Sequence, residues 1–312
     1  MLGKGFILSP DQAQELIQQD SRNKDVLFPY LNGEDLNSRP DCSASRWVIN
    51  FHDWSEERAR EYPQVFEIVE RNVKPERLKN NRKVYRDYWW QYAEKRPAML
   101  RALRNLDRVL VVARVSKTGL PVFVTSKQVM SEQTVVFTTQ AAADFATLSS
   151  GIHQAWTIAQ ASTLETRVRD TPSDVYDTMP LPLPTPRMEE TGSALSMKRK
   201  EIMLLRQIGV TKLYNLIHDV GNGDADIVKL RQMHVAVDEA VLDAYNWGDL
   251  SLKHGFHLSR QGNQFGIAPM VRGEILDRLL ELNHAQYRID AGRAGLATGA
   301  RRVLEDPDAT LF

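Results

Sequence analysis

Positive charge and aromatic rings are concentrated between residues 71 and 104. Eleven Lys and Arg side chains stand there against three acidic ones, a local charge of +8 in a 312-residue chain whose 40 basic and 40 acidic side chains cancel. Clustered cations neutralise DNA phosphates, while arginine and aromatic rings read groove edges and stack on bases. The segment therefore predicts nucleic-acid contact, which we expect from Arg77, Lys79, Arg82, Lys83, Arg86, Lys95 and Arg96.

The alternative for this segment is a solvated helix face with its tryptophans in a core. Each of Trp89 and Trp90, taken alone, is expected in the core. Adjacent helix positions point about 100° apart, however, so one of the two could instead be exposed. Both interpretations remain open at the level of sequence.

Two further groups of cations lie near predicted strands. Arg114, Lys117 and Lys127 surround a turn, and an arginine or lysine in the major groove can bind guanine through two hydrogen bonds. Arg167 and Arg169 share one face of an extended segment, because strand side chains alternate. The alternatives are a hairpin edge protected by charge for the first group, and ion pairs with Glu165 or Asp170 for the second.

Other chemistry is weakly supported. Five histidines invite a metal site, but none lies in an HExxH motif and the single cysteine, Cys42, cannot form a paired zinc motif. Asp53 with Glu76 and Lys79 has the loose composition of a nuclease site, yet the ExxK spacing equally suits a helical ion pair. We expect neither a metal nor a catalytic residue. The lone Cys42 excludes an internal disulfide and fits a reducing cytosol.

The elements that carry these residues are mixed. Residues 5–8 read as a strand, Ser9-Pro10-Asp11 as a helix start, and residues 27–31 and 47–51 as strands, with Asn32-Gly33 as a turn. One helix is expected from Ser55 to about residue 73, and β-branched runs predict strands within 108–137. Ser149 and Ser150 are expected to cap the next helix. Beyond the Pro-rich residues 182–186, helices are predicted over 198–216, 224–245 and 269–288, with a Gly-rich loop at 251–266 and fraying over the last 20 residues.

Two stretches resemble one family in the same order. The runs are LFPYLNGEDLNSRPD with RWVINF at residues 27–51, and SSGIHQAW with STLETRVRDTPSDVYDTMPLP at residues 149–182. They resemble the target-recognition domain of large adenine-specific DNA methyltransferases of the MmeI and Eco57I type (types IIG and IIL), which are fused restriction–modification enzymes with phage-defence relatives. LRQMHVAVDEAVLDAYNWGDL and HGFHLSRQG resemble the helical tail of the same family.

The resemblance implies a reader of DNA without its catalyst. An adenine methyltransferase needs a glycine-rich cofactor turn and an Asn/Asp-Pro-Pro-Tyr/Phe loop, but the chain contains no Pro-Pro pair. We therefore expect no cofactor in this chain, and S-adenosylmethionine only in a partner methyltransferase domain or subunit, which would flip the target adenine. The expected partners are double-stranded DNA and that methyltransferase, and no membrane.

The expected architecture is α+β. A mixed-strand DNA target-recognition (specificity) domain over residues 1–184 is followed by a helical C-terminal domain over residues 187–312. The absence of a signal peptide or long apolar run predicts a soluble, cytoplasmic protein. Two other functions stay open: a truncated remnant that binds nothing specific, and a protein-interaction adaptor that uses the helical tail, which an exposed apolar patch within residues 200–245 would support.

Overall fold

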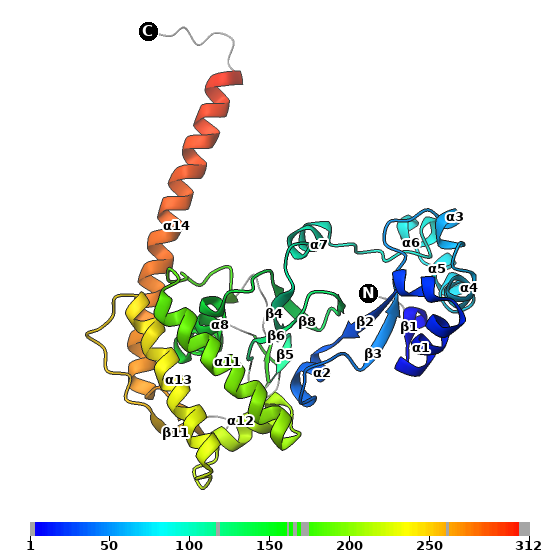
Figure 1. Ribbon diagram of the computed structural model, residues 1–312. Coiled ribbons are helices and arrows are strands. Elements are labelled where there is room, and N and C mark those ends of the chain that lie inside the picture. The colour runs from blue at the N-terminus through cyan, green and yellow to red at the C-terminus, as the bar shows by residue number, and fades with distance from the viewer. Residues whose placement is uncertain are drawn as a thin grey trace.

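The protein is built around two separate hydrophobic cores. The computed structural model describes residues 4–116, 119–160, 162–164, 167–169, 175–259 and 262–305, with only the backbone for 162–164, 167–169 and 290–305. The first core joins residues between Phe6 and Trp90, and the second joins residues between Leu31 and Leu279. Figure 1 shows the first lobe, made mostly of residues 4–30 and 46–92, beside a larger second lobe, which residues 33–44 join.

The first lobe packs short helices against a small mixed sheet. The sheet has the order β1-β3-β2-β7, in which β2 pairs with β3 antiparallel and with β7 parallel. Ser9 caps α1 in a reciprocal capping box with Gln12, as its sequence predicts. The elements of this part of the chain are η1 (Lys4–Phe6), β1 (Ile7–Leu8), α1 (Pro10–Gln19), η2 (Ser21–Asp25), β2 (Leu27–Leu31), α2 (Gly33–Ser38), β3 (Arg46–Ile49), α3 (Glu56–Ala59), α4 (Pro63–Asn72), α5 (Lys74–Leu78) and α6 (Lys83–Asp87). Among them, α2 packs into the second lobe, where Leu36 joins the second core.

The second lobe has a central antiparallel sheet of order β6-β4-β8. Its strands β4 (Arg108–Ala113), β6 (Val122–Thr125) and β8 (Thr134–Phe137) confirm the predicted strand region. A second sheet, of order β5-β10-β9, combines β5 (Val115–Ser116), β9 (Ser162–Leu164) and β10 (Arg167–Arg169). Helix α7 (Pro97–Leu103) precedes β4, and β7 (Val129–Met130) links this lobe to the first sheet.

Helices from both sides of the Pro-rich segment at residues 182–186 pack together. Helix α11 (Pro186–Arg206) runs beside α8 (Ala142–Ser149) and α13 (Ala225–Ala244), as Figure 1 shows. Gly192 lies where α11 meets α8, and a Cβ added there would overlap the Ala142 carbonyl oxygen. Glu189 accepts hydrogen bonds from the Ala142 and Ala143 amides at the start of α8, at 3.1 and 2.7 Å. The second core therefore draws on residues from both sides of this segment.

The remaining helices complete the second lobe. Ser150 Oγ accepts a hydrogen bond from the His153 amide at 3.1 Å, which confirms that Ser150 caps α9 (Gly151–Gln160). Helix α12 (Val210–His218) follows α11, and the long α14 (Pro269–Glu305) leaves the body of the protein, as Figure 1 shows.

Five predictions of local structure were wrong. The helix predicted over residues 198–216 is two helices, because α11 ends at Arg206 and α12 begins at Val210. Asn32 does not make a turn: its side chain caps α2. The helix predicted from Ser55 is two helices, because Pro63 has no N–H to donate and starts α4 anew. Residues 255–266 are a hairpin of β11 (Gly255–Ser259) and β12 (Gly262–Gly266) rather than a loop. Backbone helix also continues to Glu305, where fraying was expected.

The α+β class is confirmed, with mixed strands followed by a helical region. The division into domains at residues 184 and 187 stays a prediction.

Candidate nucleic-acid interface

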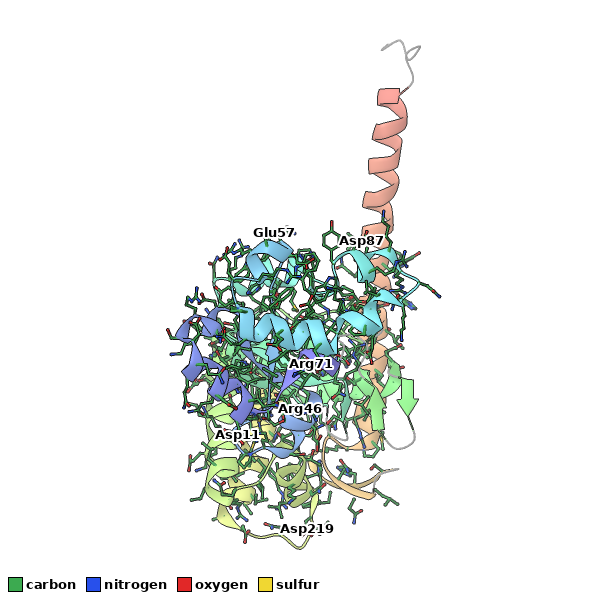
Figure 2. All side chains as sticks on the ribbon, turned by 90° about the vertical axis from the view of Figure 1, so that its right-hand side faces the viewer. Asp11, Arg46, Glu57, Arg71, Asp87 and Asp219 are labelled. Atoms are coloured by element: carbon green, nitrogen blue, oxygen red, sulfur yellow. The ribbon has the colours of Figure 1, made fainter. Side chains whose placement is uncertain are left out.

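Three exposed cations of the first lobe lie in the loop between α5 and α6 and at the first residue of α6. We call residues 79–83 the basic loop; Lys79, Arg82 and Lys83 in it are exposed. The Lys83 ammonium lies 3.9 Å from the Asp87 carboxylate, with 82% of its side chain exposed, so this pairing is weak. Figure 2 views the molecule with the first lobe toward the viewer. The labelled residues Arg71 and Asp87 lie on either side of the basic loop in the sequence.

Two predicted contact residues instead hold the basic loop in shape. Arg77 is only 5% exposed and donates to the Gln91 carbonyl at 2.8 Å, with its guanidinium over the Tyr85 ring. Burial lowers the pKa of Arg77. Arg86 donates to the carbonyls of Asn80 and Asn81 at 2.6 and 3.0 Å. The structure corrects the expectation that Arg77 faces a ligand, because charge in the sequence does not report burial.

The tryptophans of this segment belong to the first core. Trp89 and Trp90 are 4% and 7% exposed, which confirms the core interpretation for both. The Trp90 indole donates to the Trp54 carbonyl at 2.9 Å. Lys95 lies 2.7 Å from Asp53 in an exposed ion pair, so its charge is partly balanced on the surface.

Arg96 and Arg114 meet in a different place, a groove of about 460 Å³ in the second lobe. The groove follows six consecutive residues of β8 and its exit, from Thr134 to Thr139. The Nε of Arg114 is buried and has no hydrogen-bond partner among the described residues. The other lining residues are Met99, Asp144, Tyr176 and Asp177. Sequence reasoning found the two arginines but missed the strand edge and the acidic residues, because the groove joins segments up to 81 positions apart in sequence.

The remaining predicted contact residues are spread over the second lobe. Lys127 is exposed between β6 and β7, whereas Lys117 lies outside the described residues. Arg167 and Arg169 stand on strand β10, which confirms the extended segment; their side chains lie outside the description. Backbone pairing places β10 beside β5, the strand that precedes Lys117 in the sequence.

Other sites receive no support from the described residues. Within the described ranges, no group of three His, Cys, Asp or Glu side chains is arranged to hold a metal ion. None of the described helices combines the length and the apolar character needed to cross a membrane. Four apolar side chains are exposed within residues 200–245: Leu204, Leu205, Val220 and Val228.

Comparison with known proteins agrees with this arrangement. The family model of the MmeI target recognition domain matches residues 2–183. Among solved structures, the chain is similar to the type IIL restriction–modification enzyme MmeI in complex with DNA, with a TM-score of 0.64 and 18% sequence identity. That match covers 91% of this chain and 34% of the MmeI chain, so this chain spans about a third of the length of MmeI. A search of curated proteins gave no match. Over residues 2–183, the chain therefore belongs to the family of MmeI target recognition domains.

Proposed function

We propose that this chain recognises a specific sequence in double-stranded DNA on behalf of a restriction–modification enzyme. The observation that carries the proposal is the match of residues 2–183 to the MmeI target recognition domain. The exposed cations Lys79, Arg82 and Lys83 support it, because they supply sequence-independent attraction to phosphates. Lys127 and the strand that carries Arg167 and Arg169 are then the elements that approach base edges.

The catalytic step belongs to a methyltransferase outside this sequence. Since MmeI is about three times as long as the part matched here, the rest of such an enzyme would be supplied by a further segment or a separate chain. That partner would bind S-adenosylmethionine and methylate adenine at N6, while this chain selects the site. We place the system in the cytoplasm, where it would act in defence against phage.

The experiment is DNA binding at several salt concentrations. A fluorescent duplex of mixed sequence is titrated with the wild-type chain and with the Lys79→Ala/Arg82→Ala/Lys83→Ala variant, between about 50 and 200 mM salt. Loss of up to three phosphate contacts should weaken binding and make the plot of log affinity against log salt shallower, by roughly 0.9 per contact. The matched control removes the exposed Lys212 and Lys229 of the helical region. No binding by wild type at low salt, or equal slopes for all three proteins, contradicts the proposal.

A role as a protein-interaction adaptor has one observation in its favour, the exposed apolar side chains of residues 200–245. The DNA experiment separates the two functions. An adaptor without DNA affinity would show no binding, and substitution of Leu205, 76% exposed, by Ser would then be expected to remove a protein complex.

A further inference from the structure

Strand β8 has a free edge that opens into the groove. The sheet order β6-β4-β8 leaves β8 with β4 as its only partner within the described part of the chain. The Arg114 amide donates to the Gln133 carbonyl at 2.8 Å, which marks residues 114 and 133 as a hydrogen-bonded pair. Antiparallel pairs alternate between hydrogen-bonded and open, so the N–H and C=O of Val136 point away from β4.

Side chains line the groove opposite that edge, and the groove is partly open to solvent. Arg96 and Met99 of the α7 region line the same groove as residues 134–139, and so do Tyr176 and Asp177. Tyr176 packs edge-on against Phe137, with ring centroids 4.7 Å apart. The edge of four strand residues is about 13 Å long at roughly 3.3 Å per residue. A slot of this kind accepts one added strand, because neighbouring strands lie only about 4.8 Å apart.

The charges of the slot are different at its two ends. Arg114, whose Nε is buried without a partner, stands opposite the start of β8. Asp144 lies past its end, where it accepts a hydrogen bond from the Thr139 hydroxyl at 2.6 Å. A phosphodiester backbone is complementary only to the arginine end, and it offers no donors to the outward carbonyls of β8. The outward Thr134 N–H is already bonded to the Ser131 carbonyl, at 3.2 Å, so within β8 the N–H and C=O of Val136 are the pair offered to an added strand. An extended peptide matches this pair and the two charges.

We propose that the groove takes an extended segment of a partner polypeptide as an additional strand on β8. The segment carries an acidic side chain toward Arg114 and a basic one toward Asp144. The proposal does not depend on DNA binding, and it assigns Arg96 and Arg114 to protein rather than to DNA.

The test is a subtractive peptide selection. A phage-displayed library of random peptides of about ten residues is selected on the wild-type chain after depletion on the Val136→Pro variant. Proline removes the outward N–H of Val136 and is tolerated on an edge strand whose N–H faces away from the ladder. The expected result is enrichment of extended sequences with opposite charges near their ends. Their synthetic peptides should bind wild type at least tenfold more tightly than Val136→Pro.

Two measurements keep the result decisive. Hydrogen exchange of the Val136 amide should slow when an enriched peptide binds, and Arg114→Gln should weaken peptides with an acidic end more than peptides in which that residue is neutral. If Val136→Pro unfolds, judged by far-UV circular dichroism and thermal melting, Arg114→Gln replaces it in the depletion step. No enrichment over the depleted bait overturns the proposal. The proposal is also overturned if Val136→Pro weakens binding to duplex DNA as much as it weakens binding to the peptides. It is overturned as well if the wild-type chain forms a dimer that Val136→Pro dissociates.

Discussion

Replacing Gly192 by Ala tests whether the helical region and the recognition domain fold as one unit. Gly192 lies at the crossing of α11 with α8, and the added methyl group would overlap the Ala142 carbonyl oxygen. It would also lie 3.1 Å from the Ala146 Cβ, where ordinary carbon contacts are about 3.5 to 4.0 Å. The backbone of α8 cannot rotate out of the way as a side chain does, so the two helices must separate by roughly 1 Å.

Two opposing effects set how much Gly192→Ala changes the free energy of unfolding. Alanine favours a helix interior over glycine by about 1 kcal/mol. Overpacking a well-packed contact costs about 1 to 3 kcal/mol, and the upper end applies here because the obstruction is backbone. The separation also stretches the hydrogen bonds from the Ala142 and Ala143 amides to Glu189. We expect a net loss of about 2 kcal/mol in the free energy of unfolding, or a melting temperature lower by roughly 4 to 8 °C.

The assay is urea unfolding followed by circular dichroism, with Gly273→Ala as the matched control. Gly273 lies within α14, and a Cβ added there has no neighbour within 4 Å, so this substitution should stabilise the protein by up to about 1 kcal/mol. A Gly192→Ala variant as stable as Gly273→Ala would show that the close contact between α8 and α11 does not exist. Separate unfolding transitions for the two regions would refute the single unit.

Three further outcomes are expected. Burial lowers the pKa of His153 and His218 to about 4 and that of His234 to about 3, so the unfolded chain takes up protons near pH 6.5 that the folded chain excludes. Stability should therefore be full above pH 6.5 and fall toward pH 4, by up to about 1.4 kcal/mol per pH unit for each histidine; urea titrations that show no pH dependence would contradict this. Arg77→Met should cost about 2 kcal/mol in the free energy of unfolding, measured in urea, while DNA affinity at fixed salt is unchanged. A loss of DNA affinity in a folded variant would instead show that Arg77 contributes to DNA binding. Glu189→Gln should lower the melting temperature through a loss of about 0.5 to 1 kcal/mol at the start of α8, and a melting temperature as high as that of the neighbouring Glu190→Gln would refute the cap.

Sequence patterns predicted elements that depend on local chemistry. Ser9 caps a helix because its hydroxyl accepts a bond from the Gln12 amide, three residues away. The strands β4, β6 and β8 follow from β-branched residues between turn signals. The resemblance carried by residues 27–51 and 149–182 predicted the family, which the match over residues 2–183 confirms.

The features that sequence could not predict depend on contacts between distant segments. Arg77 and Arg82 look alike in a basic run, but only the fold brings the Gln91 carbonyl to Arg77 and buries it. The groove needs Arg96, Arg114 and Tyr176 in one place, and no local pattern joins them. Val136 reads as an ordinary strand residue until its neighbours show which edge of the sheet is free.

The two cores have a consequence for how such proteins diversify. Most buried residues between Phe6 and Trp90 form a core of their own, so substitutions among them leave the interior of the other lobe in place, whereas Leu31, Leu36 and Cys42 belong to the second core. Between the cores, β2 pairs with β7 over only two register positions, Tyr30 with Val129 and Leu31 with Met130. Recombination between related genes near the α6–α7 connection would therefore exchange the first core together with α2, which packs against β4 and α12, so an exchanged α2 must also fit the second core of the recipient.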